Sequence, residues 1–327
     1  MKKIALVGCG DVASVHLDAI QDIADAELVA LCDRDPAVLA AAMARFGVPG
    51  FGDHAVMLRE MDIDVLHVCT PHSEHARIAI DALDAGVHVL LEKPLADDPE
   101  RGEAVIDAAE RSSAKIGVCF QNRYNPTSVR MAEELESGRW GRILGARAQV
   151  MWTRTADYYT AKPWRGTWAG SGGGLLMNQA IHTVDLVQWL VGPVEAVTGV
   201  TSTLMFGDVI EVEDTAVAVL EHEGGVRTNF YATLTHFTNA PVLLEITCEH
   251  GTLRLEGDLR AVHGDGRVEV LEAADVVRTA RNYWGASHVR LIEDFYADLE
   301  DPEPFWIDAE EAYASLDIVQ SIYAIEE

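Results

Sequence analysis

The chain has 327 residues, with 25 lysines and arginines against 53 aspartates and glutamates, so its formal net charge is −28. A hydrophobic share of 49% is typical of a globular protein and excludes a disordered chain. The negative charge disfavours binding to nucleic acid or to an anionic membrane surface, and no apolar run approaches the ~18–20 residues of a membrane span.

The first third of the chain alternates short apolar runs with helical patterns. We expect strands at residues 4–7, 27–32, 65–69, 87–91 and 115–120, and helices at 12–23, 36–46, 74–85 and 99–112, with an irregular link at 47–52. Strands rich in Val, Ile and Leu without polar alternation are buried on both faces, as in a parallel sheet covered by helices. This pattern predicts a doubly wound α/β domain over residues 1–122.

Beyond residue 122 the pattern changes. We expect a helix at 126–137, a long strand at 143–152, a polar glycine-rich loop at 153–174 and a helix at 175–190. Strands follow at 194–204, 214–221, 226–235, 242–248 and 252–255, and two helices follow at 288–299 and 309–325. These elements predict an α+β domain over residues 123–327, built on an open, mainly antiparallel sheet. Such a sheet needs cover on its apolar face, so we expect a homodimer or homotetramer through it.

The chain start imitates a secretory signal, because Lys2 and Lys3 precede an apolar run. That run is shorter than a signal core of ~7–15 residues, and Asp11 follows it at once. A buried strand that enters a glycine turn explains the segment better. The five cysteines are scattered without a CxxC spacing, which favours buried thiols over disulfides or zinc. We therefore expect a cytoplasmic protein without a bound metal.

A glycine turn follows the first predicted strand and opens the first helix. Its sequence, Gly8-Cys9-Gly10-Asp11-Val12-Ala13, is a G-x-G-x-x-A variant, in which the glycines permit a tight turn and close approach of a pyrophosphate. The helix N-terminus then offers N–H groups to the phosphates. Within this turn, Asp11 is interpreted as a helix cap more than as a ligand.

An acidic residue ends the second predicted strand, where a carboxylate binds the adenosine ribose in dinucleotide-binding folds. This residue is Asp33, and its charge would repel a 2′-phosphate, so NAD is the expected cofactor. Arg34 beside it could accommodate that phosphate, and NADP is kept as the alternative.

Two further strand ends should border the cofactor, because ligands of open α/β sheets bind at the carboxyl ends of the strands. The motifs there are Thr70-Pro71 with His72 and His75, and Glu92-Lys93-Pro94. The stiff Pro94 fixes Lys93 in place. From spacing alone, an ion pair between Lys93 and Glu92 at a surface turn is an equally good interpretation.

A third polar group lies in the predicted helix at 175–190. At ~100° per residue, Asn178, His182 and Asp185 fall within an arc of ~60° on one helix face. A polar stripe in a buried helix is costly unless it is satisfied or used. Asp185 could orient the His182 ring or belong to the packing, and a metal is disfavoured because no third ligand has suitable spacing.

In this order, the motifs resemble the glucose–fructose oxidoreductase / inositol dehydrogenase / MocA (Gfo/Idh/MocA) family over nearly the whole chain. The resemblance rests on Gly8-Cys9-Gly10, Thr70-Pro71 with His75, Glu92-Lys93-Pro94, Gln121-Asn122-Arg123 and the glycine-rich helix with His182. It implies a Rossmann domain and an open-sheet domain. It also implies NAD(P)-dependent hydride transfer to or from a secondary alcohol or ketone of a sugar, sugar acid, cyclitol or nucleotide sugar.

The resemblance also implies roles for individual residues. Lys93 corresponds to the catalytic lysine and His182 to the acid/base histidine, whereas Asn178 replaces the family's usual aspartate. The run from Met177 to His182 resembles members that act on nucleotide-linked amino-sugar acids. We expect cofactor contacts from Gly8, Gly10, Asp11, Val12, Ala13, Asp33, Arg34, Thr70, Pro71, His72, His75, Glu92, Lys93, Gln121, Asn122, Trp164 and Arg165. We expect substrate contacts from Lys93, Arg123, Tyr158, Asn178, His182 and His288.

In the expected mechanism, His182 removes the hydroxyl proton and Lys93 stabilises the negative charge that develops on the same oxygen. Asn178 orients the substrate or Lys93. This mechanism requires the Lys93 ammonium and the His182 imidazole to lie over the same nicotinamide ring. Three alternatives stay open: an NAD-dependent glycoside hydrolase on the same fold, a non-catalytic nucleotide-binding regulator, and a reductase of a carbonyl or imine.

Overall fold

The computed structural model describes residues 1–274 and 287–325, and these form two compact units. The first unit holds Met1–Gln121 together with the segment from α10 (Ser287–Asp298) to Tyr313. The second begins at Asn122, and the division falls again within α11 (Ala309–Ala324). Across the two described ranges, no helix has both the length and the apolar character needed to cross a membrane.

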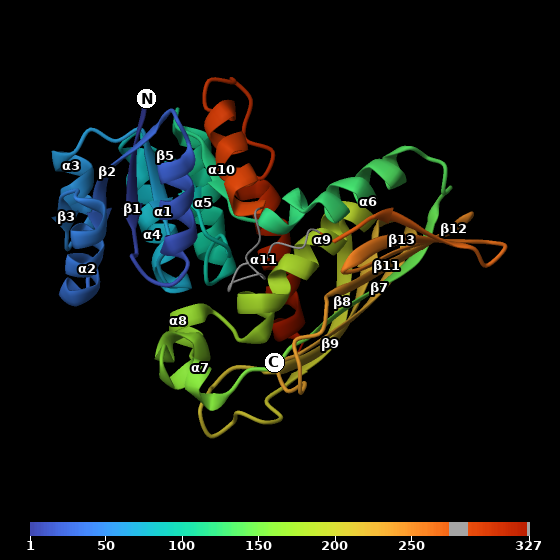
Figure 1. Cartoon of the computed structure of the whole chain (residues 1–327). Helices are drawn as coiled ribbons and strands as arrows, with labels where there is room; N and C mark the ends of the chain where they lie inside the picture. The colour runs from blue at the N-terminus through green and yellow to red at the C-terminus, as the bar shows by residue number, and fades with distance from the viewer. Residues whose placement is uncertain (275–286, 326–327) are drawn as a thin grey trace. The chain divides into compact units, whose positions relative to one another are not determined.

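The first unit is built on a six-stranded parallel sheet with the order β3-β2-β1-β4-β5-β6, flanked by helices (Figure 1). Its strands are β1 (Lys2–Val7), β2 (Ala26–Cys32), β3 (Gly50–Phe51), β4 (Val65–Val68), β5 (His88–Leu91) and β6 (Ile116–Val118). Its other helices are α1 (Ala13–Asp22), α2 (Pro36–Phe46), α3 (His54–Glu60), α4 (His75–Asp84) and α5 (Pro99–Arg111). The predicted doubly wound sheet is confirmed, and β3 adds a short strand within the link expected at 47–52.

The helix α2 begins and ends at residues that explain its bounds. The side chain of Asp35 accepts hydrogen bonds from the N–H groups of Ala37 and Val38, and Pro36 occupies the first turn of α2. Gly47 ends the same helix with a φ of 72°, a left-handed conformation that glycine adopts readily. Such caps are local signals, which is why the predicted range of this helix agrees with the observed one.

The helix α10 belongs to the first unit, whereas the sequence pattern predicts a second domain that spans all of residues 123–327. The side chains of Leu291, Ile292 and Phe295 are fully buried. A Cβ atom at Gly117 in β6 would come within 2.8 Å of Phe295 and 2.9 Å of Phe305. The missing side chain at Gly117 thus leaves room for two aromatic rings from the distant end of the chain.

The second unit contains a sheet whose described strands follow the order β14-β13-β12-β11-β7-β10-β9-β8. These strands are β7 (Ile143–Met151), β8 (Val194–Ser202), β9 (Thr215–His222), β10 (Arg227–Thr233), β11 (Leu243–Cys248), β12 (Gly251–Glu256), β13 (Asp258–His263) and β14 (Val268–Glu272). Neighbouring strands are antiparallel except for the parallel pair of β7 and β10. The helices α6 (Pro126–Glu136) and α9 (Ile181–Val191) pack on this sheet (Figure 1).

Three features of this unit differ from the sequence predictions. The loop expected at 153–174 contains the short helices α7 (Ala156–Thr160) and α8 (Trp168–Ser171), and β13 and β14 were not predicted. The helix expected at 175–190 begins as a π-helix over Leu176–Ala180 and continues as α9. Because a π-turn is wider than an α-turn, the single ~60° arc expected for the polar stripe does not apply there.

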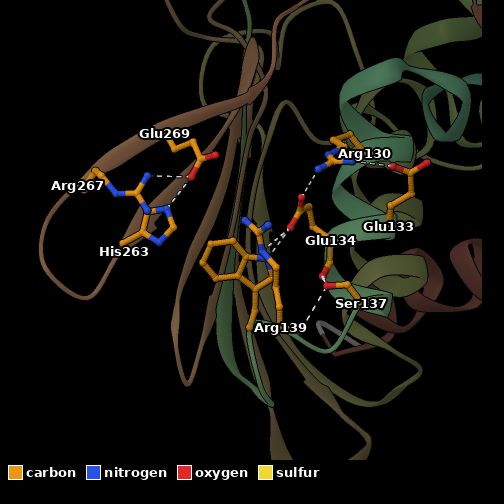
Figure 2. Close-up of polar contacts among 9 residues, drawn as sticks. Arg130, Glu133, Glu134, Ser137, Arg139, His263, Arg267 and Glu269 are labelled. Atoms are coloured by element: carbon orange, nitrogen blue, oxygen red, sulfur yellow. Dashed lines mark hydrogen bonds and ion pairs between the residues drawn. The ribbon is translucent and has the colours of Figure 1, made fainter.

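A buried carboxylate secures the end of α6. Glu134 is 3% exposed, and it accepts hydrogen bonds from Arg130 at 2.5 Å and from the Trp140 indole at 2.9 Å. Arg139 lies 2.9 Å from the same carboxylate. Figure 2 shows the two arginines converging on Glu134, with Ser137 bonded to its backbone carbonyl. The contacts join α6 to the turn that leads into β7.

Candidate functional site

The predicted cofactor residues of the first unit lie at one edge of its sheet. Because β1, β2, β4, β5 and β6 are parallel, their carboxyl ends share that edge. The residues that follow these ends are Gly8, Asp33, Thr70, Glu92 and Gln121. Ligands of this architecture bind at that edge.

The glycine turn after β1 needs glycine for two reasons. Gly8 has a φ of 87°, and a Cβ atom there would lie 2.6 Å from the backbone oxygen of Cys69. A Cβ atom at Gly10 would meet no heavy atom within 4 Å, so the chain leaves open space at this position. Asp33 stabilises the turn, because its Oδ2 accepts a hydrogen bond from the Cys9 N–H at 2.7 Å and its Oδ1 accepts one from Asp35 at 2.8 Å.

The N-cap residue of α1 cannot cap the helix with its side chain. This residue is Val12, one position after Asp11, and it makes no side-chain cap hydrogen bond. The first N–H groups of a helix have no partners within the helix, and an anion near them is stabilised by the helix dipole. An uncapped N-terminus after a glycine turn therefore suits a pyrophosphate.

Two buried polar atoms at the same edge also fit a dinucleotide. Within the described part of the chain, Thr70 Oγ1 and Gln121 Oε1 are buried and have no hydrogen-bond partner. Buried polar atoms in native proteins almost always have partners, since leaving them unsatisfied is costly. A cofactor with hydroxyl and amide groups supplies such partners, so these residues fit NAD. Arg34 is largely exposed and lies 3.6 Å from Glu74.

His75 joins the two loops that carry the predicted motifs. Its Nδ1 lies 2.7 Å from the Pro94 carbonyl oxygen, and its Nε2 lies 3.0 Å from the Thr70 carbonyl oxygen. The ring is fully buried and packs near the buried His72, with ring centroids 5.6 Å apart. Burial lowers the pKa of His75. These contacts give His75 a positioning role between the loops that follow β4 and β5.

The Glu92 side chain does not lie at the surface, so the alternative of a surface ion pair between Glu92 and Lys93 is wrong. Glu92 is 5% exposed, and its Oε1 lies 3.0 Å from His16 Nε2 and 3.2 Å from His288 Nε2. The Lys93–Pro94 peptide bond is cis. His288, which we expected to contact substrate, is 1% exposed and bound to Glu92 inside the first unit. We therefore assign His288 to this buried cluster.

In the second unit, two polar side chains stand out in a buried helical stretch. From residue 173 to residue 187, every residue is buried except Asn178 and His182, which are partly exposed. These are the two residues of that stretch for which the sequence analysis expected a catalytic role. The helix thus keeps one amide and one imidazole accessible while its other side chains pack.

The third member of the predicted stripe has a different environment. Asp185 is fully buried and accepts hydrogen bonds from Arg123 at 2.6 and 3.0 Å and from Ser315 at 3.4 Å. Arg123 is itself 1% exposed, and its guanidinium lies 5.5 Å from the centroid of the Trp189 ring. A bidentate buried pair of this kind joins segments of the fold. It favours a structural role for both residues over the substrate contact expected of Arg123.

The aromatic loop supplies neighbours to the same helix. Gln179 Nε2 donates a hydrogen bond to the Tyr158 hydroxyl at 2.8 Å. The Arg165 guanidinium lies 4.4 Å from the Tyr158 ring centroid and 5.8 Å from that of Trp164. The structure therefore brings together Tyr158, Trp164 and Arg165, the three loop residues expected to contact cofactor or substrate. Gln179 was missed, because a lone glutamine in a helical pattern carries no functional signal.

A buried acid that was not predicted from the sequence binds the start of this helix. Glu213 accepts hydrogen bonds from the N–H groups of Gly174 at 2.8 Å and Leu176 at 2.7 Å, and from the Tyr323 hydroxyl at 2.8 Å. A Cβ atom at Gly174 would come 2.1 Å from the Glu213 backbone oxygen, so only glycine permits this approach. Burial raises the pKa of Glu213 to about 7, although the three hydrogen bonds favour the carboxylate form.

The raised pKa of Glu213 predicts a pH-dependent stability. Between pH 4.5, the ordinary value, and about 7, the folded protein holds a proton that the unfolded chain has released. The free energy of unfolding contributed by this group therefore falls as pH rises through that interval and is constant above it, by up to about 3 kcal/mol. Urea unfolding of wild type and Glu213→Gln at pH 5, 6, 7 and 8 should give a difference that declines to pH 7 and then levels. An equal difference at pH 5 and pH 8 would contradict the assignment.

Comparisons with known proteins identify the family and the fold of the two units. Residues 2–120 match the model of an oxidoreductase family with an NAD-binding Rossmann fold, and residues 128–254 match a GFO/IDH/MocA C-terminal domain. D-apiose dehydrogenase of Paraburkholderia graminis is 30% identical over 297 residues, covering 89% of this chain and 77% of that protein. Inositol 2-dehydrogenase of Rhizobium meliloti is 30% identical over 201 residues, covering 62% and 58% of the two chains.

Among solved structures, the WlbA dehydrogenase from Bordetella pertussis, in complex with NADH and UDP-GlcNAcA, superimposes with a TM-score of 0.87. The two sequences are 34% identical, and the match covers 99% of this chain and 95% of that one.

Proposed function

The chain belongs to the Gfo/Idh/MocA family of NAD-binding oxidoreductases, and from that premise we propose that it oxidises a secondary alcohol of a nucleotide-linked sugar acid. The similarity to WlbA over 99% of the chain supports this substrate class. Asn178, in place of the usual aspartate, is consistent with it. The observation that carries the assignment of a reactive site is the partial exposure of Asn178 and His182 alone in the stretch 173–187.

The cofactor is held by the edge of the parallel sheet in this proposal. The Gly8–Gly10 turn and the uncapped end of α1 receive the pyrophosphate, and Asp33 receives the adenosine ribose. Thr70 and Gln121 offer their buried oxygens to the remaining hydroxyl and amide groups. When bound, NAD⁺ supplies the hydride acceptor for the carbon that carries the alcohol.

The acid–base work falls to two residues. His182 takes the proton of the substrate hydroxyl, since an imidazole accepts a proton near neutral pH. Lys93 donates a hydrogen bond to the same oxygen and stabilises the negative charge that develops on it. Asn178 orients the substrate by its amide. An amide does not take up a proton, so the proton is assigned to His182 rather than to position 178.

The experiment that tests this function is a scan of substrates in which the absorbance of NADH measures turnover. UDP-linked uronic acids, free sugar acids, neutral sugars and cyclitols are each incubated with the full chain and NAD⁺ or NADP⁺. We expect the largest kcat/KM for a nucleotide-linked acid with NAD⁺. Glycoside cleavage without NADH accumulation would favour the hydrolase alternative, and NAD binding without turnover on any substrate would favour a regulator.

The glycine turn gives a prediction that separates strain in the chain from exclusion of the cofactor. Gly8→Ala forces a Cβ atom against the Cys69 backbone at a φ that alanine rarely adopts, so both stability and NADH affinity should fall. Gly10→Ala meets open space in the chain and should keep the melting temperature while the NADH Kd rises about tenfold or more. Fluorescence titration with NADH and thermal melts measure the two effects. Unchanged affinity in Gly10→Ala would place the pyrophosphate elsewhere.

Assembly and location complete the proposal. The sheet face opposite α9 carries Val200 and Val217, which are paired across β8 and β9 and are 52% and 47% exposed. We propose that a second copy of the chain covers this face, and light scattering of the purified protein should give a mass above that of one chain.

The five free cysteines are consistent with a cytoplasmic location.

A further inference from the structure

A line of buried side chains runs through the first unit to Glu92. Tyr296 of α10 lies with its hydroxyl 2.8 Å from His67 Nε2 in β4. His67 Nδ1 lies 2.8 Å from His16 Nδ1 in α1, and His16 Nε2 lies 3.0 Å from Glu92 Oε1. His288 of α10 approaches the same oxygen at 3.2 Å. All five side chains belong to residues at most 5% exposed.

The contacts allow one consistent placement of protons when Glu92 is ionised and the histidines are neutral. A carboxylate only accepts hydrogen bonds, so the His16 proton lies on Nε2 and its Nδ1 is an acceptor. His67 must then donate from Nδ1, which leaves its Nε2 to accept from the Tyr296 hydroxyl. Burial lowers the pKa values of His16 and His67. Burial acts to raise the pKa of Glu92, but hydrogen bonds from His16 and His288 outweigh it and hold that pKa well below its usual value. These directions agree with that placement.

The line ends at the residue before the proposed catalytic lysine. The Glu92 N–H donates to the Val68 carbonyl at 2.9 Å, so the pairing of β4 with β5 extends to Glu92. Successive side chains of an extended segment point to opposite sides. A Glu92 carboxylate fixed among α1, β4 and α10 therefore determines the backbone from which Lys93 departs.

We propose that Glu92, held by the line Tyr296–His67–His16 and by His288, is a positioning residue for Lys93. This inference rests on the proposed function, because it assigns Glu92 a purpose through the role of Lys93. The line links α1, β4, the end of β5 and α10. The helix α10, from the distal part of the chain, therefore helps to fix the position of Lys93. The position of the Lys93 ammonium affects kcat, because a donor displaced from the reacting oxygen stabilises its developing charge less well.

The first test compares Glu92→Gln with Glu134→Gln, a matched loss of a buried carboxylate in the second unit. We expect Glu92→Gln to lower kcat about tenfold or more, with KM and the NADH Kd within about threefold of wild type. Glu134→Gln should lose stability and keep the kcat of the folded fraction. Equal kcat in both variants after correction for the folded fraction would overturn the inference.

Lys93→Ala distinguishes failure of this inference from failure of the proposed function. Loss of turnover in Lys93→Ala together with unchanged kcat in Glu92→Gln rejects the positioning role alone. Full turnover in Lys93→Ala rejects the proposed function, and the inference falls with it.

The second test needs no substitution at Glu92. In ¹⁵N spectra of wild type at pH 7, His16 should be neutral with its proton on Nε2, and His67 neutral with its proton on Nδ1; His16→Asn and His67→Asn assign the signals. Tyr296→Phe, which removes the last donor, should shift the His67 Nε2 signal. Doubly protonated rings or the opposite tautomers would overturn the assignment.

The same cluster is also the group of described residues that could hold a metal, because one ligand atom from each of His16, Glu92 and His288 lies within 4.8 Å of the others. Metal analysis of the purified protein should find no stoichiometric zinc. Stoichiometric zinc that is lost in Glu92→Gln would make these residues ligands and would overturn the positioning role.

Discussion

Replacing Lys93 with alanine is expected to lower kcat by about 10²–10³-fold on the substrate found in the scan, because it removes the donor assigned to the developing oxyanion. The NADH Kd should change by less than about threefold, since the pyrophosphate and ribose contacts come from other residues. Steady-state kinetics and a fluorescence titration on the same preparation measure both effects.

A matched control is the lysine at the amino end of a strand in the same sheet, away from the carboxyl ends where the cofactor is proposed to bind. Lys115 precedes β6 and binds Asp298 at 2.6 Å, whereas Lys93 follows β5. Lys115→Ala should therefore weaken the attachment of α10 and keep most of the turnover of the folded protein. A comparable loss of kcat in both variants would show that the lysine at position 93 has no special part in the reaction.

Replacing His182 with alanine is expected to lower kcat by about 10²–10⁴-fold, the range associated with loss of a general base. A base of this kind makes kcat rise with pH, and that rise should vanish in the variant, since no imidazole then titrates at the reacting oxygen. Added imidazole should restore part of the rate. A pH–rate series with and without imidazole measures all three effects.

The control for His182 is a histidine with an ordinary structural contact. His263 lies in β13, and its Nε2 is 2.9 Å from Glu269 Oε2 (Figure 2). His263→Ala should keep the wild-type pH profile. If His182→Ala retains that profile as well, the proton is taken by another group and the acid–base assignment is wrong.

Local signals in the sequence account for the parts of the fold that were predicted well. The helix Pro36–Phe46 has a capping aspartate, a first-turn proline and a terminating glycine, all within 13 residues of chain from Asp35 to Gly47. The glycine turn follows a run of buried apolar residues, so its place at the end of β1 could be derived. The buried apolar strands alternating with helices predicted a doubly wound parallel sheet, and the structure confirms it.

The parts that could not be predicted depend on partners far apart in the chain. Arg123 and Asp185 are separated by 62 positions, Gly174 and Glu213 by 39, and His288 and Glu92 by 196. No local pattern marks such pairs, because each residue by itself is an ordinary polar side chain. The π-turn at Leu176–Ala180 was not predicted either, and its first residue donates its N–H to Glu213, 37 positions away.

The return of α10 to the first unit bears on how the protein is made. During synthesis, the ribosome releases residues 1–121 long before Phe295 and Phe305, the rings that lie against Gly117, or His288, which binds Glu92. While the intervening sheet is being translated, Gly117 therefore lacks its two aromatic neighbours and Glu92 lacks His288. A fragment cut after residue 121 lacks these neighbours permanently, so a recombinant version of this part has to include the segment that ends at Tyr313.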